Sequence, residues 1–221
     1  MPWDRAGEFV VGDVVRPASL RRKALRGPRA VRVPTTDAGV RYFAPSVLVH
    51  GSEDETPSYD LYDATAPAVL LCSLAPEKGG ARYRVTDAQG TELGLAHRTP
   101  AAKRTVQHSW WLQQPGHPDI VARYHWARGN AKQAAKRGKE SVGRVAGHVA
   151  QDVIGSVFSF GAEDTGPGES DVSKPVTWRM AGQENSVVLT SGHAEGFRTY
   201  LPQVSWLDRR LAFALAVLRE A

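Results

Sequence analysis

The sequence predicts a closed antiparallel β-barrel of about twelve strands around a buried hydrophobic C-terminal α-helix. Three observations lead to this fold class: an apolar run near the end of the chain, a repeated hairpin pattern, and many short strand candidates separated by turns. A closed sheet has no free edges and lines an interior space, so it can enclose a helix that has no polar face. A two-layer packing is the alternative, but it would leave one side of that helix in water.

The apolar run extends from Leu211 to Leu218 and contains no polar residue. At about 100° per residue these positions cover the whole circumference of a helix, so the helix must be enclosed on every side. A membrane span needs roughly 20 apolar residues, whereas this run covers only about 12 Å. Ser205 and Asp208 have the spacing of a capping box, which places the helix start near Ser205. We therefore expect a central helix over residues 205–221.

The first 55 residues admit two interpretations. Short strand candidates occur at Glu8 to Val15, Val31 to Val33 and Ser46 to His50, and prolines interrupt the stretch. Proline and the polar break after His50 are typical of turns and boundaries. Residues 1–55 are therefore either an N-terminal arm or the first strands of the barrel, and residues 56–221 form the barrel domain.

From Tyr59 onward the hairpin pattern is repeated. The segment Tyr59 to Ala64 (YDLYDA) recurs 24 residues later as Tyr83 to Ala88 (YRVTDA). In both copies the tyrosine and the Leu or Val alternate with polar residues, which predicts a half-buried strand. The aspartate of each copy favours a turn. Return strands are expected at Ala68 to Leu74 and in the residues that lead to Ala96.

Further strand candidates follow, separated by turn-rich segments, and together they favour a barrel or sandwich. They are residues 105–113, 120–126, 142–149, 153–160, 176–181, 186–190 and 197–201. Trp110 and Trp111 are consecutive, so on a strand they face opposite sides. One of them can enter the core while the other lies at the surface, unless neighbouring loops shield both.

The sequence contains none of the common catalytic or nucleotide-binding motifs. Its seven histidines lack the spacing of a metal-ligand pair, and His117 and His125 are interpreted as surface residues. The single Cys72 lies in an apolar run, which is typical of a buried thiol. Ser191-Gly192-His193 is interpreted as a turn. We expect no catalytic residues, no metal, no cofactor and no enzymatic activity, with an enzyme site at the barrel mouth as an alternative.

Positive charge is concentrated in two stretches, although the net charge is only +5. Residues 16–32 hold seven arginines and lysines and no acid, and residues 123–144 hold seven more with one acid. Such a local excess indicates either an anionic partner or solvated loops. The candidate anion- or lipid-binding residues lie in the second stretch and are Arg128, Lys132, Lys136, Arg137, Lys139 and Arg144.

The order of these features resembles the tubby C-terminal-like superfamily, whose relatives include phospholipid scramblases and plant LURP-one-related proteins. The resemblance rests on the Tyr-x-Leu/Val-x-Asp hairpins, the strand Glu92 to Leu95 and the closing segment Asp208 to Leu215. It covers residues 59–221 or extends back to Val31. It implies a twelve-stranded barrel around a C-terminal helix. It also implies contact with lipid, since tubby domains bind phosphoinositide head groups and scramblases associate with membranes. This chain lacks the proline-rich arm, cysteine cluster and calcium loop of scramblases, so lipid scrambling is not expected.

The basic stretches and the resemblance suggest two functions from different classes. The first is a non-enzymatic binding module that contacts anionic phospholipid or a protein partner through basic loops. The second is nucleic-acid binding through residues 16–32, since phosphate contacts require only positive charge. The chain shows no signal peptide or transmembrane stretch, and its single cysteine fits a reducing compartment, so we expect a cytoplasmic protein.

Overall fold

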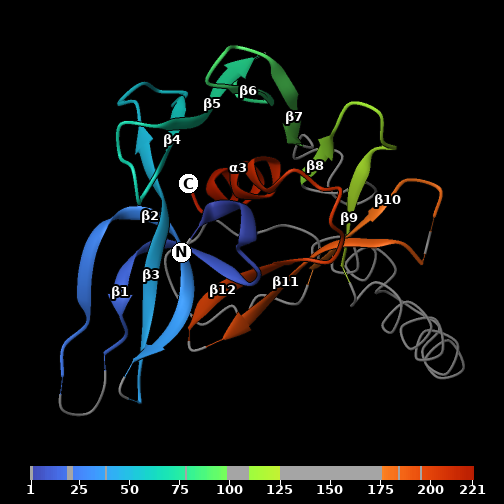
Figure 1. Ribbon diagram of the computed structural model, residues 1–221. Coiled ribbons are helices and arrows are strands. Elements are labelled where there is room, and N and C mark those ends of the chain that lie inside the picture. Colours follow the sequence, from blue (N-terminus) through green and yellow to red (C-terminus); the bar gives the residue numbers. More distant parts are fainter. Residues whose placement is uncertain are drawn as a thin grey trace, which may run out of the picture.

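The computed structural model describes residues 2–18, 22–37, 39–77, 79–98, 110–124, 176–183, 185–194 and 196–221. Within these ranges twelve strands form a closed antiparallel barrel, and a single α-helix lies inside it (Figure 1). The predicted fold class is confirmed. The strand candidates at 142–149 and 153–160 lie outside the described residues.

The strands follow one another around the barrel in chain order, and β1 pairs with β12 to close it. A 3₁₀ turn, η1 (Trp3–Arg5), precedes the first strand. The strands are β1 (Phe9–Arg16), β2 (Leu25–Asp37), β3 (Val40–Gly51), β4 (Tyr59–Asp63), β5 (Leu70–Glu77), β6 (Arg82–Asp87), β7 (Glu92–Arg98), β8 (Trp110–Gln113), β9 (Ile120–Tyr124), β10 (Val176–Met180), β11 (Val187–Ala194) and β12 (Phe197–Pro202). The helix α3 (Arg209–Arg219) follows the last strand.

The first three strands belong to the barrel, so residues 9–51 are not a separate arm. β2 is much longer than the predicted strand at Val31 to Val33 and contains two prolines. β1 pairs with β2 along residues 25–32, and β3 pairs with β2 along residues 30–37. Pro28 and Pro34 therefore each lie where β2 has a partner on one side only, which is where a strand tolerates proline.

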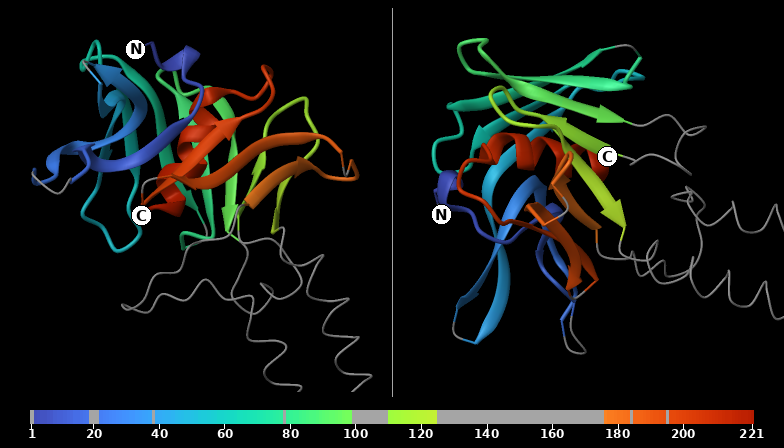
Figure 2. Two further views of the ribbon diagram at one scale, coloured as in Figure 1. Left: turned by 90° about the horizontal axis from the view of Figure 1, so that it is seen from below. Right: turned by 90° about the vertical axis from the view of Figure 1, so that its right-hand side faces the viewer.

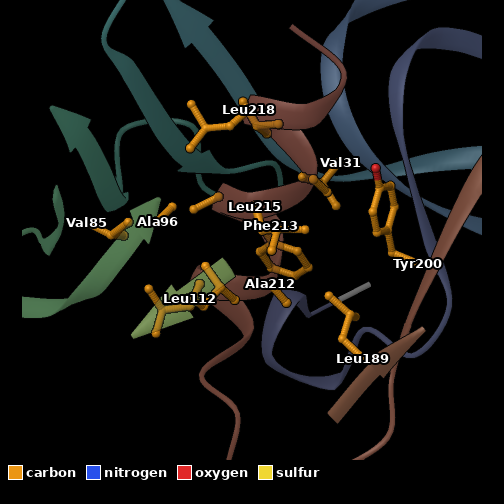
Figure 3. Close-up of a cluster of buried hydrophobic side chains, with 14 of the residues drawn as sticks. Val31, Val85, Ala96, Leu112, Leu189, Tyr200, Ala212, Phe213, Leu215 and Leu218 are labelled. Carbon is orange, nitrogen blue, oxygen red and sulfur yellow. The ribbon is translucent and has the colours of Figure 1, made fainter. Parts of the chain in front are cut away.

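The apolar run forms the core of the barrel. All residues from Leu211 to Leu218 are buried, and the most exposed of them, Leu218, is only 6% exposed. α3 contacts β1, β5, β7, β8 and β12, and it passes through the middle of the barrel (Figure 2). Strand side chains surround Phe213 and Leu215 (Figure 3). Burial of each large apolar side chain contributes about 1.5–3 kcal/mol to the stability of the fold. The packing of α3 therefore stabilises the strands that it contacts.

Across the described ranges, no helix combines the length and apolar character that crossing a membrane requires.

The helix begins at Arg209, which is later than the capping-box spacing predicts. The N-cap is Asp208, whose Oδ1 accepts a hydrogen bond from the backbone N–H of Arg210 at 2.9 Å. The N–H of Asp208 itself donates to Gln114 Oε1 at 3.0 Å. The turn between β8 and β9 therefore holds the residues before the helix in a loop, and the prediction that Ser205 starts the helix is wrong.

The repeated hairpin pattern forms the predicted strands and turns. Asp63 Oδ1 accepts a hydrogen bond from the N–H of Thr65 at 2.7 Å, and Asp87 Oδ1 accepts one from the N–H of Thr91 at 2.8 Å. Each aspartate therefore begins a turn through its own side chain. The apolar positions of both copies are buried in the core: Tyr59, Leu61, Tyr83 and Val85.

The two consecutive tryptophans of β8 face opposite sides, as predicted. Trp110 points into the barrel and is 6% exposed. Trp111 lies on the outer wall, where it stacks on His97 of β7 with the ring centroids 3.7 Å apart. The Trp110 side chain therefore lies inside the barrel, at the end where α3 ends.

Candidate anion-binding site

An arginine from β2 holds the end of α3. Arg29 Nη2 donates hydrogen bonds to the backbone oxygens of Val217, at 3.1 Å, and of Glu220, at 3.0 Å. The last carbonyls of a helix have no partner within the helix and carry the negative end of its dipole. Arg29 therefore satisfies two of these oxygens and places positive charge at this end of the barrel.

Glu220, the C-cap residue of α3, contacts two side chains of β12. The hydroxyl of Tyr200 donates to Glu220 Oε1 at 2.7 Å, and Arg198 Nη1 donates to the same oxygen at 3.2 Å. Alternate residues of a strand lie on one face, so Arg198 and Tyr200 both reach the end of the helix. Burial raises the pKa of Tyr200, so its hydroxyl stays protonated and acts as a donor.

Three arginines at this end lie over aromatic rings. The pairs, with the distance from the guanidinium carbon to the ring centroid, are Arg29–Tyr59 (5.6 Å), Arg98–Trp110 (6.0 Å) and Arg219–Trp178 (5.1 Å). Trp178 Nε1 donates to the backbone oxygen of Trp110 at 3.3 Å and so joins the last two pairs. Each cation–π contact contributes about 0.5–2 kcal/mol and fixes the direction of the guanidinium group.

Tyr83 of β6 is a further buried aromatic side chain, and it belongs to the same core cluster as Tyr59 and Trp110. Burial raises the pKa of Tyr83, Tyr59 raises it further, and Arg98 opposes both effects. We call the whole set the arginine–aromatic ring. Its members are Arg29, Tyr59, Tyr83, Arg98, Trp110, Trp178, Arg198, Tyr200 and Arg219. They come from seven strands and from α3, so only the closed barrel brings them together.

The ring carries an excess of positive charge. Its nine members include four arginines and no acidic residue, and Arg198 contacts the carboxylate of Glu220. Within the described ranges, Arg29 and Arg98 have no carboxylate partner. On the outer wall, by contrast, Arg84 of β6 pairs with Glu77 at 2.7 Å. The ring can therefore attract an anion more strongly than the paired charges of the wall can.

The predicted lipid-binding residues lie outside the described residues, and they are Arg128, Lys132, Lys136, Arg137, Lys139 and Arg144. They belong to the part of the chain that joins β9 to β10. The last residue of β9, Tyr124, pairs with the first residue of β10, Val176, which pairs in turn with Ser191 of β11. Ser191 Oγ lies 3.5 Å from Nη1 of Arg219, a member of the ring. Tyr124 and Val176, the described residues that flank this part of the chain, are therefore paired with the strand that reaches Arg219.

The other basic stretch, residues 16–32, is divided by the structure. Arg32 is only 1% exposed and donates to backbone oxygens inside the fold. Arg29 belongs to the arginine–aromatic ring. The exposed basic members in the described part of this stretch are Arg22, Lys23 and Arg26. The stretch therefore does not present all of its charge on one surface.

No group of His, Cys, Asp and Glu side chains in the described part of the chain is arranged to hold a metal ion. Cys72 is buried, as predicted, and burial raises the pKa of its thiol to about 12. His117 stacks on Trp206 with the ring centroids 4.1 Å apart. His125 lies outside the described residues.

Ser191-Gly192-His193 does not form a turn, so that prediction is wrong. The three residues lie within β11. Ser191 is 5% exposed and pairs with Tyr200 of β12, so its small side chain faces the end of α3. All three residues pair with residues of β12, so the sheet keeps them in a strand although serine and glycine have low strand propensity.

Sequence reasoning included one arginine of the ring, Arg29, as a member of the basic stretch 16–32. Arg98, Arg198 and Arg219 stand apart from one another in the sequence. Arg219 offers a local signal, because cations are favourable in the last turn of a helix. The other two become neighbours of the site only when the barrel closes.

The fold and the site together define a helix-filled β-barrel with a positively charged end. No protein-family model, curated protein or solved structure matches the chain. The resemblance to the tubby C-terminal-like superfamily thus stays a prediction that rests on the order of its motifs.

Proposed function

We propose that this protein is a non-enzymatic binding module that contacts anionic phospholipid through the arginine–aromatic ring and the basic stretch between β9 and β10. The observation that carries the proposal is the gathering of four arginines at the end of the barrel where α3 ends. The described residues that flank the basic stretch, Tyr124 and Val176, lie at the same end. Anionic membranes attract basic residues near their surface by about 1 kcal/mol each.

The nucleic-acid alternative relies on a different surface. It needs the arginines of residues 16–32 to reach solvent together, but Arg32 is buried and donates to backbone oxygens inside the fold, and Arg29 lies at the end of α3. Arg26 is exposed and pairs with Asp13 at 2.7 Å. These contacts favour the ring as the surface that meets an anion.

Co-sedimentation with vesicles tests the proposal. The full chain is mixed with phosphatidylcholine vesicles that either contain or lack phosphatidylserine. We expect binding to the anionic vesicles only, with a bound fraction that falls as the salt concentration rises, because salt screens exposed charges. Equal sedimentation with neutral and anionic vesicles would contradict the proposal.

Replacing Arg98 with Gln tests the ring itself. Arg98 is exposed, so its loss removes about 1 kcal/mol of attraction, and we expect roughly fivefold weaker vesicle binding. Arg84→Gln is the matched control, since Arg84 is exposed but lies near both Glu77 and Glu92. An equal loss in the two variants would show that binding depends on total charge and not on the ring.

A further inference from the structure

The arginine–aromatic ring already holds one anionic group, the carboxylate of Glu220. This carboxylate lies at the C-terminal end of α3, where the helix dipole disfavours negative charge. Its Oε1 accepts hydrogen bonds from the hydroxyl of Tyr200, at 2.7 Å, and from Arg198, at 3.2 Å. These donors therefore keep a carboxylate in a place that the helix alone does not favour.

Two of the three donors, Tyr200 and Arg29, are positioned by contacts that do not involve the side chain of Glu220. Tyr200 is fully buried beside α3 (Figure 3). Its ring stacks on that of Phe9 with the centroids 5.5 Å apart. Arg198 lies in β12, where it pairs with His193 of β11. Arg29 is held by the backbone oxygen of Val217. Removing the carboxylate would leave Tyr200 and Arg29 in place, and the pairing of β12 with β11 would keep the backbone of Arg198 beside them.

The site is open to solvent, so an external group can reach it. The side chain of Glu220 is 27% exposed and that of Arg198 is 20% exposed. Both donors act on a single oxygen of the carboxylate. A phosphate group has several oxygens and up to two negative charges, so it can accept charge-assisted hydrogen bonds from Arg198 and Arg29 as well as from Tyr200.

We propose that Arg198, Tyr200 and Arg29 form an anion-binding subsite, that Glu220 is its internal occupant, and that a phosphate group displaces Glu220. The phosphate is either free or part of a lipid head group. The inference rests on the proposed function and adds a regulatory contact to it. Because the occupied site is not competent to bind, Glu220 lowers the apparent affinity for external phosphate.

Thermal unfolding in inorganic phosphate tests this inference. Phosphate replaces chloride at constant ionic strength, so that screening does not change. We expect Glu220→Ala to show a saturable rise in Tm with a phosphate affinity roughly tenfold higher than that of the wild type. Glu53→Ala is the matched control, since Glu53 is an exposed acid in the turn between β3 and β4. It should respond as the wild type does.

Two further variants make the result specific. Adding Arg198→Gln to Glu220→Ala should abolish the saturable response, because it removes a donor of the subsite. Glu220→Gln keeps the shape of the side chain without its charge, and it is used if Glu220→Ala is unstable. Equal phosphate responses in the Glu220 variants, the Glu53 control and the wild type would overturn the inference.

Vesicles containing phosphatidic acid distinguish a lipid source of phosphate from a free one, because their head group is a phosphate monoester. Tighter vesicle binding by Glu220→Ala supports the lipid source. Tighter binding of inorganic phosphate without any vesicle binding supports the subsite and contradicts the proposed function. Wild-type binding to anionic vesicles with no effect of Glu220→Ala in either assay contradicts the subsite alone.

Discussion

Arg32 joins three strands at the N-terminal side of the barrel. It is 1% exposed, and its guanidinium donates to backbone oxygens of Gly12 in β1, Pro28 in β2 and Phe43 in β3. Arginine carries five N–H donors in a planar group, so it can serve several carbonyls at once. Burial lowers the pKa of Arg32, and Asp13 opposes this effect. Its charge is therefore kept inside the fold by hydrogen bonds.

Arg32→Met should destabilise the protein strongly. The change leaves three carbonyls without their donor, and an unsatisfied buried acceptor costs about 1–3 kcal/mol. We expect the free energy of unfolding in urea to fall by about 3 kcal/mol. The control is Arg26→Met, since the side chain of Arg26 is 68% exposed and its ion pair with Asp13 is worth less than about 1 kcal/mol. Similar losses in both variants would show that Arg32 does not join the strands.

Gly94 allows β7, β8 and the start of α3 to approach closely. Its φ is +154°, and a Cβ atom there would lie 2.1 Å from the backbone oxygen of Gln113 and 3.1 Å from Leu211 Cδ1. Gly94→Ala should therefore separate the two strands and lower the free energy of unfolding by about 2–4 kcal/mol. Gly12→Ala is the comparison, because no atom lies within 4 Å of its Cβ position. Chemical unfolding that ranks Gly12→Ala as the worse variant would contradict this account.

Among the elements, α3 was predicted best because its sequence alone requires enclosure. Its start was predicted less well, because the hydrogen bond from Asp208 N–H to Gln114 comes from a distant turn. β2 was predicted as a much shorter strand, since its prolines argue against a strand wherever both neighbours are assumed to be paired. Local sequence propensity does not predict the start of α3 or the length of β2, because both depend on hydrogen-bond partners that lie elsewhere in the chain.

Leu215→Asp tests the enclosure of the helix. Leu215 is fully buried, so the change places an unpaired charge in the core. We expect a loss of about 4 kcal/mol or more and failure to fold, measured by circular dichroism and soluble yield. Leu201→Asp in β12 should fold normally, because Leu201 is 40% exposed. A Leu215→Asp protein with the wild-type melting curve would mean that water reaches one side of α3.

At the scale of the whole molecule, the barrel follows from the sequence but the arginine–aromatic ring does not. The hairpin repeats and the apolar run are local patterns, and each can be recognised within a short segment of the sequence. The contact between Arg29 and Val217 joins residues 188 positions apart. Nothing in either local segment specifies the other. A site assembled from seven strands and a helix becomes visible only when the strand order is known.

The closure of the barrel also constrains when folding can occur during synthesis. β1 must pair with β12, and the core is supplied by α3, which follows every strand. While the ribosome still holds α3, the earlier strands have nothing to pack around and β1 lacks its partner. Contacts between such distant segments slow folding, and unpaired strands are prone to aggregate in the meantime. The final residues of α3 to be translated therefore determine when the nascent chain can become a stable domain.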